Sequence, residues 1–330
     1  MDYLAFEQPI ADLESEIQAL DQQGSDTAGR SEQLRELRRK LTETTRKIYS
    51  GLDPWQIVQV SRHKDRPHTV DYLNLVFDEF VELHGDRKFG DDRAMRVGFA
   101  RLENYKVLVV GHEKGRNFKE RTENCFGCAH PEGYRKALAK MKLAAKFNIP
   151  VICMIDTPGA YPGIGAEERG QAQVIAENMF EMSRLPTPII CVVIGEGGSG
   201  GALGIGVGDR VAMLQFAYYS VISPEGCAGI LWKGAQHAPR AATSLKFTSQ
   251  YLPGFGIVDD VIEEPLGGAH RDHHHMAANL RNYFKKCLRE LSGKPVEKML
   301  ENRYAKFRKM GKFLEPETVV EPEVAPVETA

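Results

Sequence analysis

A glycine-rich turn directly follows a strongly apolar segment in the middle of the chain. Residues 188–194 are Pro-Ile-Ile-Cys-Val-Val-Ile, and residues 195–201 carry five glycines in seven positions. An apolar run that ends in glycine is typical of a buried strand, and the small and apolar residues at 202–205 predict a helix after the turn. The free N–H groups of a helix start, with no Cβ atoms around them, suit the binding of a negatively charged group. We therefore expect a site built from backbone amides.

The same glycines also match a dinucleotide-binding fingerprint. Gly195, Gly197 and Gly200 have the required spacing, but that fingerprint needs an acidic residue about 20 positions further on to hold a ribose. Residues 211–224 contain none. Glycines also allow close contact between a helix and a strand without binding any ligand, and this alternative stays open.

A third interpretation is the nucleophile elbow of serine hydrolases. Gly197, Ser199 and Gly201 fit its G-x-S-x-G pattern, in which the serine sits on a sharp turn from strand to helix. Acidic and histidine residues follow in the order that these hydrolases use. The candidate partners are Asp259 or Asp260, followed by His270. A serine hydrolase that uses Ser199 is therefore an alternative function.

The composition excludes several classes of protein. The chain has 330 residues, of which 42% are hydrophobic and 27% charged, as expected for a globular protein. Its formal charge of −2 argues against a general nucleic-acid-binding protein. No apolar stretch reaches the length of about 20 residues that crosses a bilayer, and the N-terminus is too acidic for a targeting peptide. We expect a cytoplasmic protein with no membrane segment.

Four regions are expected along the chain. Apolar residues at helical spacing predict an N-terminal helical hairpin over residues 1–50. The globular domain is expected over 51–291, a helical segment over 292–314, and a disordered tail over 315–330, where proline, glutamate and valine dominate.

Strands and helices alternate within the globular domain. This order predicts an α/β fold with a largely parallel sheet. A helix is also expected over 70–83, before the first strand. The expected strands are 107–111, 150–156, 188–194, 211–214 and 218–222. Two further helices are expected over 132–147 and 167–184.

A second turn resembles the glycine-rich one in its position. Residues 156–159, Asp-Thr-Pro-Gly, end a strand just before a helix, where parallel α/β folds place ligand contacts. The alternative is a turn that proline and glycine shape for structural reasons alone.

Two further groups of residues have functional and structural interpretations. Lysine and arginine are frequent over 114–146, and Arg135 and Lys136 are candidates for contacts with phosphate groups of a ligand, although most basic runs are solvated surfaces. Cys125, Cys128 and His130 have zinc-like spacing, but a structural zinc needs four ligands and the chain has no second CxxC. We expect ordinary thiols and no metal in this chain.

Several segments resemble the family of alpha subunits of the bacterial-type acetyl-CoA carboxylase carboxyltransferase. The resemblance extends from about residue 6 to residue 291 and rests on many motifs. They are residues 6–10, 131–138, 155–163, 165–171, 194–203, 220–227 and 266–271. It implies a crotonase-like superfold, a spiral of ββα repeats in which backbone amides form oxyanion holes, and it identifies 51–291 as a CoA carboxyltransferase C-terminal-type domain.

The resemblance also implies a reaction and its partners. The family transfers a carboxyl group from carboxybiotin, held by the biotin carboxyl carrier protein, to acetyl-CoA, and forms malonyl-CoA for fatty acid synthesis. The implied partners are a zinc-bearing beta subunit in an α2β2 heterotetramer, the carrier protein and biotin carboxylase. A non-catalytic scaffold for such a complex is the remaining alternative.

The resemblance assigns roles to the two turns. Gly200 and Gly201 would supply the amides of the oxyanion hole that faces biotin. The residues that would line the carboxybiotin pocket are Thr157, Pro158, Gly159, Ala160, Gly197, Gly198 and Ser199. With acetyl-CoA as a substrate, Arg135 and Lys136 become candidates for contacts with the phosphates of coenzyme A.

Overall fold

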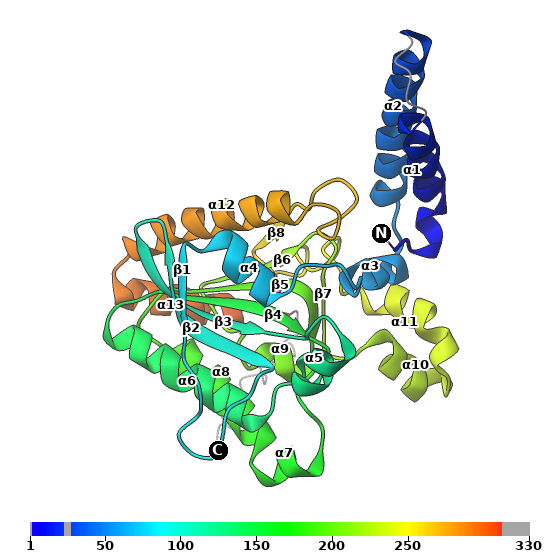
Figure 1. Cartoon of the computed structure of the whole chain (residues 1–330). Helices are drawn as coiled ribbons and strands as arrows, with labels where there is room; N and C mark the ends of the chain where they lie inside the picture. Colours follow the sequence, from blue (N-terminus) through cyan, green and yellow to red (C-terminus); the bar gives the residue numbers. More distant parts are fainter. Residues whose placement is uncertain (1, 23–27, 312–330) are drawn as a thin grey trace, which may run out of the picture.

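The computed structural model describes residues 2–22 and 28–311, and its centre is one eight-stranded sheet (Figure 1). The strand order is β1-β2-β3-β4-β5-β6-β8, and β7 pairs with the end of β5. Strand β2 pairs antiparallel with both β1 and β3, whereas β3, β4, β5, β6 and β8 are parallel to one another. The strands are β1 (Glu79–Glu82), β2 (Met95–Leu102), β3 (Tyr105–His112), β4 (Val151–Thr157), β5 (Ile189–Gly198), β6 (Arg210–Leu214), β7 (Tyr218–Ser220) and β8 (Asp260–Ile262).

The two central strands explain the apolar runs in the sequence. Every residue of β4 and β5 is buried. A parallel strand covered on both faces needs apolar side chains at successive positions rather than in alternation. The register pairs Thr157 with Gly197, so the loops after these strands leave the sheet at the same edge. The two turns singled out in the sequence are therefore neighbours.

Helices cover both faces of the sheet. Helix α6 packs on β2 and β3 and against α8, while α12 packs on α4 and β8 at the opposite face (Figure 1). The helices of the body are α3 (Pro54–Ser61), α4 (Thr69–Val76), α5 (Phe118–Glu123), α6 (Pro131–Lys146), α7 (Ile164–Glu168), α8 (Gln171–Ser183), α9 (Ser199–Leu203), α10 (Pro224–Trp232), α11 (Ala238–Leu245), α12 (His273–Ser292) and α13 (Val296–Arg308). Short 3₁₀ turns are η1 (Ala5–Glu7), η2 (Cys125–Gly127) and η3 (Ala235–His237).

The N-terminal helices stand apart from the body. Helices α1 (Gln8–Asp21) and α2 (Ala28–Ser50) pack on each other and project beside α3, α10 and α11 (Figure 1). The base of the pair is attached through the buried Glu7, whose carboxylate accepts a hydrogen bond from Tyr49 at 2.7 Å and lies 3.3 Å from the guanidinium of Arg271. The tail expected over 315–330 lies outside the described residues.

Two of the expected helices were wrong in detail. The helix expected over 70–83 ends at Val76, because Phe77 adopts an extended conformation, and β1 follows. The helix expected over 167–184 is divided into α7 and α8 at Gly170, whose φ of 82° is left-handed and interrupts a helix. The strand expected over 188–194 continues to Gly198, so the first four residues of the predicted turn belong to β5, while the other expected strands agree with the structure to within two residues. Strands β1, β2 and β8 were not predicted.

Candidate active site

The glycine-rich turn is a tight passage from strand β5 into the short helix α9. Ser199, the first residue of the helix, takes a left-handed φ of 50°. A Cβ atom on Gly198 would lie 2.1 Å from the carbonyl oxygen of Pro158, so only glycine permits this contact between the two turns. The backbone of residues 157–160 thus lies directly against the glycine-rich turn.

Gly200 and Gly201 have different surroundings. A Cβ on Gly201 would lie 2.5 Å from the amide nitrogen of Ala160, so Gly201 is packed against the second turn. A Cβ on Gly200 would meet only the side chain of Ile175, at 3.7 Å. Both residues belong to the first turn of α9, where N–H groups have no acceptor within the helix.

A cavity of about 480 Å³ opens where the two turns meet. Its walls come from four places: the loop after β4, helices α7 and α8, the start of α9 and the segment after β7. Of the residues that the sequence singled out, the cavity is lined by Pro158, Gly159, Ala160, Ser199 and Gly200. Thr157, Gly197, Gly198 and Gly201 are buried beside it, and the Thr157 hydroxyl donates to the carbonyl of Gly159 at 2.8 Å. The structure thus brings the predicted pocket residues together.

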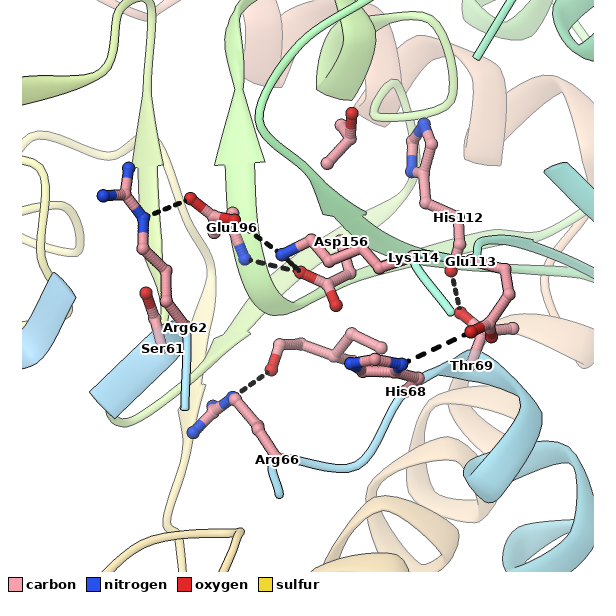
Figure 2. A network of polar contacts seen from close by, with 12 residues as sticks. Ser61, Arg62, Arg66, His68, Thr69, His112, Glu113, Lys114, Asp156 and Glu196 are labelled. Carbon is pink, nitrogen blue, oxygen red and sulfur yellow. Dashed lines mark hydrogen bonds and ion pairs between the residues drawn. The ribbon is translucent and has the colours of Figure 1, made fainter. Parts of the chain in front are cut away.

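A buried polar network lies directly behind the glycine-rich turn. The ammonium of Lys114 is 2.6 Å from the carboxylates of both Asp156 and Glu196 (Figure 2). Arg62 reaches the other oxygen of Glu196, also at 2.6 Å. Burial favours a raised pKa for Glu196, but Lys114 and Arg62 outweigh it and lower that pKa to about 2. Glu196 is therefore ionised at neutral pH.

The network also determines the charge of Lys114. Burial favours a lower pKa for its ammonium, but the carboxylates of Asp156 and Glu196 raise that pKa above its ordinary value. Arg62, Lys114, Asp156 and Glu196 line a second, smaller cavity of about 220 Å³ on the far side of Pro158. The charged groups therefore lie behind the turn and not in the larger cavity.

The sequence did not single out this network. Glu196 is separated from Arg62 by 134 residues and from Lys114 by 82 residues, so no local spacing reveals the contacts. The one available signal was a glutamate inside a segment of glycine and apolar residues, because a buried charge needs a partner.

The structure does not assemble a serine hydrolase triad. Ser199 is exposed and lies on a strand-to-helix turn, as the elbow requires. His270, however, is buried with Nε2 3.9 Å from Glu7. Asp259 accepts an amide N–H from β6, and Asp260 accepts the hydroxyl of a tyrosine on α12. Each proposed partner of Ser199 is thus engaged in another part of the fold.

The contacts of Arg135 and Lys136 correct their assignment as phosphate ligands. Lys136 is 1% exposed, and its ammonium lies 2.6 Å from Asp91 and 2.8 Å from the carbonyl of Asp92. Arg135 donates to Asp86 at 2.7 Å. Sequence shows the charge of these residues but not the direction of their side chains, which here hold α6 to the loop before β2.

The cysteines of the CxxC motif are free thiols. Burial raises the pKa of Cys125 and raises that of Cys128 to about 11, so both are protonated at neutral pH. Over residues 2–22 and 28–311, only Glu7, His63 and His270 form a cluster with metal-ligand spacing. His63 accepts the N–H of residue 65 through Nδ1, and its Nε2 faces a backbone carbonyl, so its ring nitrogens are already engaged.

Solved structures share the fold of this protein. The transcarboxylase 12S core with methylmalonyl-CoA bound has a TM-score of 0.58 at 20% identity, over 73% of this chain and 45% of that chain. The beta subunit of geranyl-CoA carboxylase from P. aeruginosa has a TM-score of 0.54 at 16% identity, over 74% of this chain and 46% of that one. The fold is that of the crotonase-like carboxyltransferases, and the predicted fold class is confirmed.

Sequence comparisons define the family. The model of the family described as acetyl co-enzyme A carboxylase carboxyltransferase-like matches residues 3–311. An acetyl-coenzyme A carboxylase carboxyl transferase subunit alpha from Rhodopirellula baltica is 66% identical over 94% of this chain and 98% of its own length. The protein of the same name from Methylococcus capsulatus is 55% identical over 96% and 99%. The chain belongs to this family of carboxyltransferase alpha subunits.

No described helix has the length and apolar character needed to cross a membrane.

Proposed function

We propose that this chain is the alpha subunit of the carboxyltransferase component of acetyl-CoA carboxylase. In this role it transfers a carboxyl group from carboxybiotin on the carrier protein to acetyl-CoA and forms malonyl-CoA, which commits carbon to fatty acid synthesis. The observation that carries the proposal is the identity of 66% with a protein of that name over nearly the full length of both chains. The motif segments that line the cavity fall within that match.

The proposed chemistry needs stabilisation of negative charge. Carboxybiotin supplies carbon dioxide and leaves a negatively charged ureido oxygen. The N–H groups of Gly200 and Gly201 would donate hydrogen bonds to this oxygen, and preorganised donors of this kind are typically worth two to three orders of magnitude in rate each. No side-chain nucleophile is required, which agrees with the engagement of Asp259, Asp260 and His270 in other parts of the fold.

The two turns would have separate tasks. The loop of Pro158, Gly159 and Ala160 would form the wall of the carboxybiotin pocket, while the start of α9 would supply the donors. What supports this division is the cavity that both segments line and the contact of 2.1 Å that a Cβ on Gly198 would make with Pro158. The charged network lies outside this cavity, so it would not touch the substrate.

The proposed complex includes other chains. A beta subunit with a structural zinc would bind acetyl-CoA and stabilise its enolate, in an α2β2 heterotetramer, and biotin carboxylase would recharge the carrier protein. Within this chain, residues 51–291 would form the catalytic domain. The helical hairpin over 1–50 and the helical segment over 292–314 would be extensions of it.

Reconstitution tests the proposal. The chain is mixed with the beta subunit from the same organism, carboxylated carrier protein and acetyl-CoA, and malonyl-CoA is measured. We expect product only when both subunits are present. An assembled complex that forms no malonyl-CoA would contradict the proposed function, and release of free acid from ester substrates by this chain alone would favour the hydrolase alternative.

A further inference from the structure

We infer that Glu196, held by Lys114 and Arg62, is a positioning residue that fixes the direction of the amides in the glycine-rich turn. The inference rests on the proposed function and deepens it, because it assigns a role to a buried network that does not line the larger cavity. Three observations carry it: the place of Glu196 in the chain, the groups that hold it, and the cost of burying those groups.

Glu196 is the only charged residue of strand β5 and lies three positions before the first residue of α9. Its backbone N–H donates to the carboxylate of Asp156 at 2.9 Å, and its own carboxylate accepts from Lys114 at 2.6 Å. Asp156 can come this close because residue 195 is glycine: a Cβ there would lie 2.5 Å from the Asp156 carboxylate oxygen. Lys114, Asp156 and Glu196 thus join the ends of three adjacent parallel strands at the site (Figure 2).

A second set of contacts extends from Glu196 to helix α10. The other carboxylate oxygen of Glu196 accepts from Arg62 at 2.6 Å and from the hydroxyl of Tyr218 at 2.7 Å. Arg62 also lies 2.5 Å from Glu225, in the first turn of α10. Both oxygens of Glu196 are therefore held from opposite sides, and the residue that leads into the turn has little freedom to rotate.

Burying the charges of this network costs desolvation free energy, so the network contributes little net stability to the fold. Glu196 and Asp156 have side-chain exposures of 8% and 5%, and Lys114 of 14%. Desolvation of charges this deeply buried offsets most of their mutual attraction, and apolar packing often stabilises a protein equally well. Unlike apolar packing, such a network also fixes the orientation of the groups that it joins. The part of the chain that it fixes is the segment that would carry the oxyanion donors.

The test compares Glu196→Gln with the wild type in the reconstituted alpha–beta complex. Glutamine keeps the shape of the side chain but loses the charge that Lys114 and Arg62 hold. A misplacement of about 1 Å can lower a rate by about a hundredfold, so we expect kcat for malonyl-CoA formation to fall about tenfold to a hundredfold. KM for acetyl-CoA should stay within about twofold, because Glu196 would not touch that substrate.

The matched control is Asp209→Asn. Asp209 forms a buried ion pair with Arg303 at 2.6 Å and accepts the N–H of Ile189, at the opposite end of the same strand β5. Loss of the Asp209 charge should lower the melting temperature but leave kcat unchanged. Arg62→Gln is the second test variant, since Arg62 is 29% exposed and its replacement should disturb the fold less than that of the buried Lys114. We expect Arg62→Gln to lower kcat, as Glu196→Gln does.

The outcomes separate the two proposals. If the wild-type complex forms malonyl-CoA and both Glu196→Gln and Arg62→Gln retain the wild-type kcat, the inference is wrong and the proposed function stands. The inference is also wrong if Asp209→Asn lowers kcat as much as Glu196→Gln does at the same fraction of folded complex. A wild-type complex without activity would instead refute the proposed function.

Discussion

Gly198 and Pro158 approach so closely that a Cβ atom on Gly198 would lie 2.1 Å from the carbonyl oxygen of Pro158. This contact joins the two turns that follow β4 and β5. The packing of one turn therefore determines the shape of the other, and the cavity between them depends on glycine at this position.

We predict that Gly198→Ala destabilises the protein and that Gly200→Ala does not. The added methyl group at 198 forces the two turns apart, and overpacking of this kind typically costs about 1 to 3 kcal/mol. At 200 the new Cβ would make an ordinary contact of 3.7 Å with Ile175. Thermal unfolding of the purified chains measures the difference. Equal melting temperatures for the two variants would show that the turns are not packed as described.

We predict that Ser199→Ala retains most of the carboxyltransferase activity. The proposed mechanism uses the amides of the turn, and the candidate triad partners Asp259, Asp260 and His270 are engaged elsewhere in the fold. A fluorophosphonate probe should leave Ser199 unlabelled. A loss of activity beyond about a hundredfold in a folded complex would restore the hydrolase alternative.

We predict that Lys136→Met leaves KM for acetyl-CoA unchanged. Lys136 is buried against Asp91 and the carbonyl of Asp92, so it is not available to a phosphate group. Lys136 is buried but its partner Asp91 is exposed, so loss of these contacts should lower the free energy of unfolding by about 1 to 2 kcal/mol. Steady-state kinetics and chemical denaturation measure the two effects. An increase of KM by tenfold or more would return Lys136 to the substrate site.

We predict that Glu196 contributes to the acid stability of the protein. Its folded pKa of about 2 is lower than the ordinary value of 4.5, so the ionised form stabilises the folded state above pH 4.5. The shift corresponds to about 3 kcal/mol, which is lost as the pH falls from 4.5 towards 2. Denaturation as a function of pH should therefore show a shallower loss of stability for Glu196→Gln in this range. Identical slopes for both proteins would contradict the lowered pKa.

Much of the fold was predictable because the central strands are buried on both faces. Strands β4 and β5 read as uninterrupted apolar runs, and parallel pairing then places their terminal turns at one edge of the sheet. The helix expected over 70–83 failed because Phe77 becomes extended and the chain enters an edge strand. That strand has an alternation of only four residues, too few for a periodicity to decide between helix and strand.

The site was predictable only where it is local in sequence. Glycine spacing and motif resemblance located the two turns, because close backbone contact requires glycine at fixed positions. The contacts of Glu196 with Arg62 and Lys114 join segments far apart in the chain, and Lys136 turned out to be buried. Composition reports the presence of a charge, whereas its direction and its partner depend on tertiary packing.

The activity of Gly200→Val in the reconstituted alpha–beta complex tests the central claim most directly. Gly200 lines the cavity and its Cα has room for a side chain, so valine should fold but obstruct the approach of carboxybiotin to the amides. The measurement is malonyl-CoA formation from acetyl-CoA and carboxylated carrier protein, with size-exclusion chromatography as the control for assembly. We predict a loss of at least about a hundredfold in an intact complex. Near-normal turnover would show that the glycine-rich turn does not hold the biotin oxyanion.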